Sequence, residues 1–461
     1  MPRPAARTVA RLPGRARPAD GVPRHAASAD LRGVPRARAA RRGAGDARSA
    51  RRRRSPGRRS AVAPGAAVLP AVRYQPLHRA GRGSPGTDVR VCSPHCGIDP
   101  ETTSGGETYE REVLRHLGVG GMTIEILLAR HKRYPEDVPN WTIRRLPIGR
   151  GLRWPIAPFV WDAQPFDLIR AHSLRYVGPA TLIARRRYRL DVPIVAHHHH
   201  LDPSPLNRFI EGPVMRAVER VVVGSRFAVR QAAEELGVPV ERFSIVPYGV
   251  DDRFRPAPRP AALLRAHGLE GKTVVLFLGG LKPRKNLFLL LDVWRRVAQE
   301  RDDARLVIAG SGPLLERLRE HAGALARERR VVFTGYVPED EKVGYYNMAD
   351  VLLFPSALEG FGFSVAEAMS CELPVVVSAR GSLPEIVVDG EGGFLCDPER
   401  PDTFVERVLQ LLADPMLRRK LGRANRERMD RLFRWDHCAA ATARVYAEVV
   451  EGWRHRRAQT R

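Results

Sequence analysis

A pair of glutamates, Glu359 and Glu367, brackets a glycine-bearing loop in this chain of 461 residues. Carboxylates accept paired hydroxyl donors, such as those of a ribose or a hexose. Gly360 and Gly362 let a ligand approach the backbone closely, because no Cβ intervenes. The N–H groups near Phe361 would face a helix amino end, which favours an anion such as phosphate. The pattern predicts a site with a sugar at one end, a ribose at the other and phosphates between. The alternative is that Glu359 caps the following helix and that Glu367 is a solvent-exposed residue of that helix.

The elements around this loop indicate how it is held. A short apolar strand at 352–354 precedes the loop, a helix begins near Phe363, and a buried strand follows at 375–377. Strand, loop, helix and strand in this order form one unit of a parallel α/β sheet. Ligands bind such sheets at the carboxyl ends of the strands. We therefore expect Glu359 at that edge and Glu367 about one turn into the helix.

A second loop with charged residues follows the apolar run 273–279 and leads into a helix predicted at 287–298. It reads Gly280-Leu281-Lys282-Pro283-Arg284-Lys285-Asn286. Two cations at a helix start, after a glycine pair, suit a diphosphate. A solvated basic turn is the alternative. A later strand, 305–309, ends in the tight turn Gly310-Ser311-Gly312-Pro313.

Two further candidates lie in the first half of the chain. Gly105 and Gly106 precede a helix expected at 107–117, so a ligand can approach the backbone there; a plain turn is the alternative. His172 follows the buried run 167–171 and is therefore expected at the ligand edge of a sheet, with a structural histidine as the alternative.

Four consecutive histidines, His197–His200, follow a strand expected at 194–196. Consecutive residues in a loop rarely converge on one metal ion. We therefore expect loop residues near a cleft rather than a metal centre.

Alternating strands and helices predict two doubly wound parallel sheets, the first within residues 87–255 and the second within 256–435. Strands of the first sheet are expected at 88–92, 124–128, 143–146, 168–171, 194–196, 221–223 and 243–246. The linker begins with the turn Tyr248-Gly249-Val250-Asp251, and the proline-rich run 254–260 then breaks both helix and strand patterns.

Residues 1–86 consist mainly of Arg, Ala, Pro and Gly. Residues 1–88 carry 21 Arg, no Lys and 4 Asp, a net charge of +17 out of +26 for the chain. Such a segment cannot bury enough apolar surface to offset its ordering entropy, so we expect a disordered tail. A targeting signal, a tether to nucleic acid or an anionic membrane, and an extension without function remain open; the last is favoured.

The remaining composition is that of a globular protein in a reducing cytoplasm. No apolar run approaches the ~18 residues of a membrane span. The five cysteines are scattered and lack zinc-ligand spacing, which argues against disulfides and against structural zinc.

Taken in order, these motifs resemble those of the retaining glycosyltransferases of family 4, which have the GT-B fold. The resemblance covers about 87–453 and rests on five patterns: Gly105-Gly106, Gly249-Val250-Asp251, Pro283-Arg284-Lys285-Asn286, Gly310-Ser311-Gly312-Pro313, and Glu359 to Glu367. The last, with Gly-Phe-Gly between the carboxylates, is the specific one. The resemblance implies two Rossmann-like domains facing a cleft and a C-terminal helix, 436–461, that crosses back to the first domain.

The resemblance also implies roles for the donor-binding residues. Glu359 would contact the donor sugar, and Glu367 the ribose hydroxyls of the nucleotide. The backbone amides of Phe361, Gly362 and Phe363 would contact the sugar and the diphosphate.

The other motif residues match positions around the diphosphate and the acceptor. Lys285 matches the lysine that binds the donor diphosphate. Gly280 stands where the family often has an arginine, and we expect Arg284 to supply that charge. His172 matches the histidine that approaches the transferred sugar, and the glycines at 105–106 match the loop near the diphosphate and acceptor.

The implied reaction transfers a hexose from a nucleotide diphosphate sugar to a glycan, lipid-linked or small-molecule acceptor, with retention at the anomeric carbon. No convincing DxD-type metal site is present in the sequence, and the cationic loop makes a metal unnecessary. We expect no cofactor and assign no covalent nucleophile.

Two alternatives stay open. One is a non-catalytic GT-B binding protein with a basic tether to nucleic acid or membrane; the intact Glu359, Glu367 and Lys285 argue against it. The other keeps the cytoplasmic enzyme but brings it to the inner face of the membrane, where the basic run 185–189 would meet anionic headgroups. A solvated helix end also explains that run.

Overall fold

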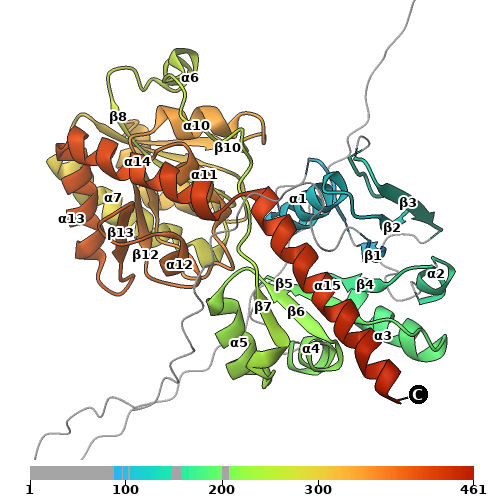
Figure 1. The fold of residues 1–461 in the computed structure, drawn as a ribbon. Coiled ribbons are helices and arrows are strands. Elements are labelled where there is room, and N and C mark those ends of the chain that lie inside the picture. The colour runs from blue at the N-terminus through green and yellow to red at the C-terminus, as the bar shows by residue number, and fades with distance from the viewer. Residues whose placement is uncertain are drawn as a thin grey trace, which may run out of the picture. The chain divides into compact units, whose positions relative to one another are not determined.

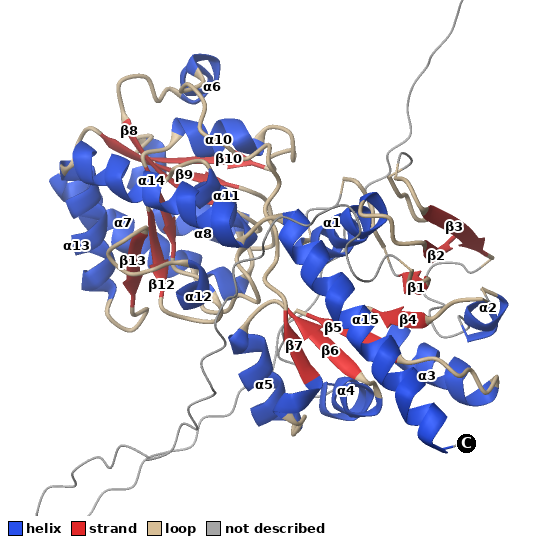
Figure 2. Cartoon of the chain, in the orientation of Figure 1, coloured by secondary structure: helices blue, strands red, loops and turns tan. Residues whose placement is uncertain are grey.

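The computed structural model describes residues 88–95, 97–101, 104–135, 138–147, 157–163, 165–199 and 207–460. Within these residues the chain forms two parallel β-sheets with helices packed on them (Figure 1, Figure 2). Both sheets belong to the same compact unit of the chain. The predicted α/β class with two parallel sheets is confirmed. The tail expected to be disordered, residues 1–86, lies outside the described residues.

The first sheet has seven parallel strands in the order β3-β2-β1-β4-β5-β6-β7. The strands are β1 Val91–His95, β2 Ile124–Ala129, β3 Trp141–Leu146, β4 Leu168–Ala171, β5 Ile194–His198, β6 Arg220–Val223 and β7 Phe243–Ile245. The helices along this stretch are α1 Gly105–Val119, α2 Ala157–Asp162, α3 Val177–Arg187, α4 Gly212–Ala217 and α5 Arg226–Leu236. A π-helical turn at Asn207–Glu211 and a 3-10 turn at Val240–Arg242 complete it.

The second sheet has six parallel strands in the order β10-β9-β8-β11-β12-β13. The strands are β8 Thr273–Leu278, β9 Ala304–Ala309, β10 Val331–Gly335, β11 Val351–Phe354, β12 Val375–Ser378 and β13 Gly393–Cys396. The helices are α6 Ala261–His267, α7 Leu287–Glu300, α8 Leu315–Ala322, α9 Ala324–Arg327, α10 Lys342–Met348, α11 Phe363–Ser370, α12 Leu383–Ile386, α13 Pro401–Ala413, α14 Pro415–Leu432 and α15 Trp435–Thr460. A 3-10 turn covers Pro283–Lys285.

The sequence forms these elements for simple reasons. Strands of a parallel sheet are buried on both faces and therefore read as continuous apolar runs, as in β8, whose last five residues are all buried. The helix α5 has recognisable ends: the Ser225 hydroxyl accepts the N–H of Ala228 at the start, and Gly237 adopts a left-handed conformation, with φ of 62°, at the end.

Each sheet reverses its strand order once, between β1 and β4 in the first sheet and between β8 and β11 in the second. At such a reversal the connections leave in opposite directions, and the carboxyl ends of the two central strands border a crevice that typically binds ligands. The strand ends at these two places are therefore where a site is expected.

The long helix α15 contacts the first sheet although it follows the second in sequence (red in Figure 1). The Nε of Arg170 in β4 donates to the hydroxyl of Tyr446 at 2.9 Å, and Arg454 pairs with Asp167 at 2.9 Å. At its start, the N–H of Val250 donates to the carbonyl of Phe433 at 2.8 Å, so the linker and the approach to α15 lie side by side.

The structure corrects two details of the expected elements. The glycine pair at 105–106 forms the first turn of α1 instead of a loop before it, because helix starts carry no apolar periodicity that would reveal them. The strand β5 extends through His197 and His198, so these two residues are buried strand residues and not loop residues. His200 lies outside the described residues.

In the part of the chain that the structure describes, every helix is too short or too polar to cross a membrane.

Gly249 gives a direct test of the contact between the linker and α15. A Cβ at this position would lie 2.3 Å from the backbone nitrogen of Trp435, so Gly249→Ala forces two backbone segments apart. We expect a loss of about 1–3 kcal/mol of stability, measured as a lower thermal midpoint and urea midpoint. Gly344→Ala is the matched control, because its Cβ would lie an ordinary 3.6 Å from Leu263 inside helix α10. A Gly249→Ala variant as stable as the wild type would contradict the packing described here.

Candidate active site

The loop between β11 and α11, which we call the donor loop and define as residues 359–363, contains the first predicted glutamate. Gly362 precedes α11 with φ of 98°, a conformation that favours glycine, and a Cβ there would meet the Leu383 side chain at 2.8 Å. The hydroxyl of Ser382 donates to the carbonyls of Glu359 and Phe361, which fixes the loop from the side of α12. The donor loop is thus a tightly held segment.

The carboxylate of Glu359 is surrounded by three donors. Its Oε1 lies 2.6 Å from the Nζ of Lys285 and accepts the hydroxyl of Ser356 at 2.6 Å, while its Oε2 lies 3.1 Å from the Nη1 of Arg284. Glu359 and Lys285 are only 5% and 7% exposed. The structure therefore brings together the carboxylate after β11 and the two cations after β8, at the strand-order reversal of the second sheet.

Burial and charge act in opposite directions on this group. Burial alone would raise the pKa of Glu359, but Lys285 and Arg284 hold it below its ordinary value, so the carboxylate is ionised at neutral pH. Burial lowers the pKa of Lys285, and Glu359 counteracts this only in part. The buried Glu359 and Lys285, together with the partly exposed Arg284, have an excess of positive charge, and an anionic ligand would compensate it.

The neighbouring loops pack closely enough to require glycine. Gly310, with φ of 145°, would place a Cβ 2.0 Å from the carbonyl oxygen of Gly279, and a Cβ at Gly312 would lie 2.6 Å from that of Leu281. The predicted Gly310-Ser311-Gly312-Pro313 turn therefore supports the backbone around Gly280. Gly280 itself has no side chain to contribute a charge, and the arginine expected to replace it, Arg284, points at Glu359.

Glu367 lies in α11, one turn from its start, and is 6% exposed. The hydroxyl of Tyr346 donates to its Oε2 at 2.7 Å. Burial works against the charge of Lys342, but the carboxylates of Glu367 and Glu339 hold its pKa above the ordinary value. The sequence analysis did not identify Tyr346 or Ser356 as site residues. Only Ser356 could have been found from the sequence, because it lies three residues before Glu359.

The first turn of α1 lies against the donor loop. A Cβ at Gly105 would lie 3.1 Å from the ring of Phe363, and one at Gly106 would lie 3.5 Å from the ring of His199. The hydroxyl of Ser225, at the start of α5, donates to the carbonyl of Gly360 at 3.2 Å. The two glycines predicted from the first half of the chain are thus close to the residues predicted from the second half.

A cluster of aromatic rings joins the same two parts of the chain. The ring of Tyr248 lies 4.1 Å from that of Tyr109, 5.0 Å from that of Phe361 and 6.0 Å from that of Phe363, measured between centroids. Trp435, the first residue of α15, lies 6.2 Å from Phe363. No pattern in the sequence predicted this cluster, because its members come from four distant segments.

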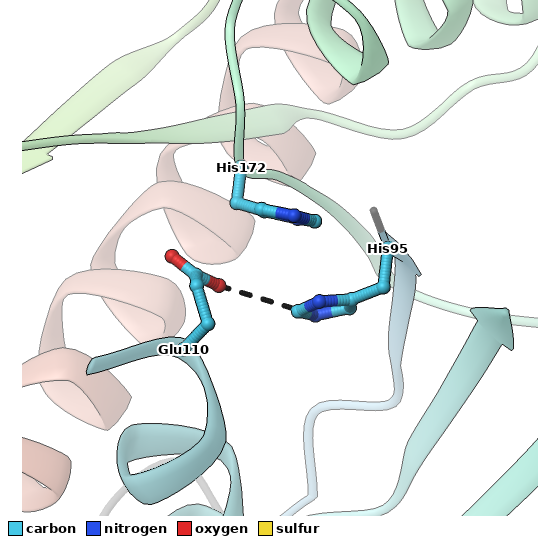
Figure 3. Close-up of side chains that lie close together, drawn as sticks. All are labelled: His95, Glu110 and His172. Atoms are coloured by element: carbon cyan, nitrogen blue, oxygen red, sulfur yellow. Dashed lines mark ion pairs between the residues drawn. The ribbon is translucent and has the colours of Figure 1, made fainter. Parts of the chain in front are cut away.

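His172 follows β4 and lies beside His95, the last residue of β1, at the strand-order reversal of the first sheet (Figure 3). Their rings stack with centroids 4.0 Å apart and planes 25° apart. Glu110, from α1, points toward both rings, and its Oε2 lies 3.9 Å from the Nε2 of His95. Burial lowers the pKa of His172 to about 4, so its imidazole is neutral at pH 7.

Within the described part of the chain, His95, Glu110 and His172 form the group of potential metal ligands, with donor atoms within 4.8 Å of one another. Nitrogen lone pairs lie in the ring planes, so two stacked rings direct them nearly parallel instead of toward one point. Glu110 is also already ion-paired with Arg170. A cation bound by both imidazoles would require one ring to turn, so the stacked arrangement does not present a ready-made metal centre.

Comparisons with known proteins agree with this arrangement. Residues 103–254 match the family model described as Glycosyltransferase Family 4, and residues 262–428 match the model described as Glycosyl transferases group 1. The chain is 32% identical over 316 residues to a D-inositol 3-phosphate glycosyltransferase of Streptomyces bingchenggensis, covering 63% of this chain and 69% of that protein. It is 34% identical over 301 residues to a GDP-mannose-dependent alpha-(1-6)-phosphatidylinositol monomannoside mannosyltransferase of Mycobacterium tuberculosis, covering 61% and 78%.

Solved structures show the same fold. Sucrose-phosphate synthase from Thermosynechococcus elongatus superposes with a TM-score of 0.65 at 22% identity, over 79% of this chain and all of that one. Anabaena Alr3699/HepE in complex with UDP and glucose gives a TM-score of 0.65 at 19% identity, over 78% and 100%. With two parallel sheets, the E-x7-E loop and matches to both family models along its length, the chain belongs to the group 1 glycosyltransferases of family 4.

Proposed function

We propose that this protein transfers a hexose from a nucleotide diphosphate sugar to the hydroxyl of a glycan, lipid-linked or small-molecule acceptor, with retention at the anomeric carbon. The observation that carries the proposal is the cluster of the buried Glu359 and Lys285 with the partly exposed Arg284, beside the start of α11. It combines an acceptor for sugar hydroxyls with two cations for a diphosphate.

Donor binding would exchange partners within this cluster. The diphosphate would take Lys285 and Arg284, which contact Glu359 in the structure, and the freed carboxylate would accept hydroxyls of the sugar. Ser356 remains hydrogen-bonded to Glu359 and keeps it oriented. Preorganised cations of this kind stabilise the charge that develops on the departing diphosphate.

The nucleotide end would lie at Glu367. Its carboxylate is held by Tyr346 and can accept the paired hydroxyls of a ribose. The backbone amides of Phe361, Gly362 and Phe363 at the start of α11 would contact the sugar and the phosphates between the two carboxylates.

The reaction would break the bond between the anomeric carbon and the phosphate oxygen, with the electron pair leaving on the diphosphate. The acceptor oxygen would bond to that carbon on the same face, and its proton would pass to the diphosphate. His172 would approach the transferred sugar as a neutral imidazole, because burial holds its pKa near 4. In this proposal the cations replace a metal ion, and no covalent nucleophile is needed.

The proposal includes three classes of acceptor: a glycan, a lipid-linked molecule and a small molecule. Both relatives are named for inositol-containing acceptors, one of them a lipid. A lipid-linked acceptor would bring the cytoplasmic protein to the inner face of the membrane, where the exposed Arg186 and Arg187 at the end of α3 would meet anionic headgroups. Arg185 is already paired with Glu219, so this basic surface is smaller than the run 185–189 indicates. Co-sedimentation of the protein without residues 1–86 with anionic but not neutral liposomes would support this. If that protein stays in the supernatant with both kinds of liposome, the membrane contact is contradicted.

A panel of UDP-, GDP- and ADP-sugars tests the proposal directly. A ligand that binds the native state raises the melting midpoint by mass action, so the true donor gives the largest shift. The M. tuberculosis relative is GDP-mannose-dependent, so GDP-mannose is the first compound to test. A protein whose midpoint is unchanged by every nucleotide sugar at millimolar concentration would contradict the proposed function.

Replacing either cation should weaken donor binding. Lys285→Ala and Arg284→Ala each remove a charged contact to the diphosphate, and each should raise the donor Kd about 10- to 100-fold. Isothermal titration with the nucleotide diphosphate measures the effect. Lys282→Ala is the matched control, because this lysine lies in the same loop but is exposed. If the Arg284 variant binds as the wild type does, the site uses one cation and Arg284 only orients Glu359.

The two carboxylates should affect different kinetic constants. The ribose does not react, so Glu367→Gln should mainly raise the donor KM. Charge develops on the sugar in the transition state, so Glu359→Gln should mainly lower kcat. Glu391→Gln, at an exposed position, is the control for a lost surface charge. An equal rise in KM with kcat intact in both variants would show that Glu359 does not act on the reacting sugar.

A further inference from the structure

A chain of buried polar side chains links α15 to the elements of the first sheet that face the donor loop. Arg170 pairs with Glu110 and donates its Nε to the hydroxyl of Tyr446 at 2.9 Å. That hydroxyl lies 2.8 Å from the Nε2 of His197, whose Nδ1 lies 3.0 Å from the hydroxyl of Tyr109. All five side chains are buried. We call these five residues the α15 relay.

The chemistry of the donors gives the relay a direction. A guanidinium has only donors, so the oxygen of Tyr446 accepts from Arg170. If the hydroxyl hydrogen of Tyr446 goes to the Nε2 of His197, that nitrogen is unprotonated. His197 then carries its proton on Nδ1 and donates it to the hydroxyl oxygen of Tyr109. Burial holds the pKa of His197 well below its ordinary value, which agrees with a neutral ring.

Three residues of the relay lie next to candidate site residues. Tyr109 and Glu110 are in the second turn of α1, whose first turn touches Phe363 through Gly105. Arg170 is two residues before His172 in the same strand-to-loop segment. A shift of the relay would therefore move the first turn of α1 and His172 relative to the donor loop.

Stability alone does not account for such a group. Taking Glu110 and Arg170 out of water costs free energy that their mutual attraction only roughly offsets, and well-packed apolar residues of similar size are often as stabilising. Burial would lower the pKa of Arg170, yet Glu110 keeps it above its ordinary value, and burial would raise the pKa of Glu110, yet Arg170 keeps it well below. The pair is therefore a fixed, fully charged anchor with a defined geometry.

We infer that Tyr446 is a positioning residue for the transfer step, which acts from α15 by setting the tautomer of His197 and the position of Arg170. The inference rests on the proposed function. It assigns the C-terminal helix a part in aligning His172 and the first turn of α1 with the transferred sugar, separate from the donor contacts of Glu359, Lys285 and Glu367.

The test is Tyr446→Phe in the full chain, assayed with the donor found in the panel. Donor Kd should stay within twofold, because the hydrogen bonds and the ion pair that define the relay do not involve Glu359, Lys285 or Glu367, while kcat for transfer should fall at least tenfold. Tyr345→Phe is the matched control, because Tyr345 also shares a hydroxyl contact with a histidine, His267 at 3.1 Å, but lies in α10. The assay is run at a temperature below the melting midpoint of the variant, so that the protein is folded. A wild-type kcat for Tyr446→Phe under these conditions would overturn the inference and show that the Tyr446 contacts are purely structural. So would a parallel loss of donor affinity.

A second measurement does not depend on activity. In protein labelled with 15N-histidine, the wild type should show His197 protonated on Nδ1, and Tyr446→Phe should weaken or reverse that preference. His197 protonated on Nε2 in the wild type would overturn the relay. If no nucleotide sugar binds the wild type, the proposed function fails while this experiment still reports on the relay.

Discussion

The single reversal of strand order in each sheet is the constraint on which the rest of the structure depends. It leaves the carboxyl ends of β1 and β4, and of β8 and β11, without a connection crossing over them. The stacked histidines lie at the first reversal, and the Glu359 cluster lies at the second. The glycines then serve these two places by allowing loops and helix starts to come close together, as Gly105 and Gly310 do.

The cluster of Glu359, Lys285 and Arg284 illustrates how a charged group can be held ready without a ligand. The buried Lys285 and the partly exposed Arg284 need a counter-charge, and Glu359 supplies it in the structure. Binding a diphosphate would replace one set of charged contacts by another, so little of the cluster has to be reorganised. The first sheet uses charge differently, because Glu110 and Arg170 pair with each other, while burial keeps the pKa of the neighbouring His172 low and its imidazole neutral.

The sequence analysis identified features that depend on residues close together in the chain. The apolar runs predicted the strands of the first sheet and those of the second except β13, and the E-x7-E spacing with the cationic loop identified residues that the structure brings into contact. It could not identify what depends on distant partners. Tyr446 reaches Arg170 across 276 positions and Ser225 reaches Gly360 across 135, and of these residues only Gly360 stands in a recognisable motif. His197 and His198 were assigned to a loop because polar side chains interrupt the apolar run, although a strand end with buried partners accommodates them.

The side-by-side course of the linker and the approach to α15 bears on how such a protein can be recombined. Gly249 and Val250 leave the first sheet where Phe433 and Arg434 return toward it, so the part that carries the first sheet is discontinuous in sequence. In a chimera that takes only the segment before the linker from another protein, the new first sheet would pack against an α15 from a different parent. The hydrogen bond between Arg170 and the hydroxyl of Tyr446 would then lose its matched partner. The structural unit to exchange is the first sheet together with the last helix. An exchange made at the linker alone divides this unit.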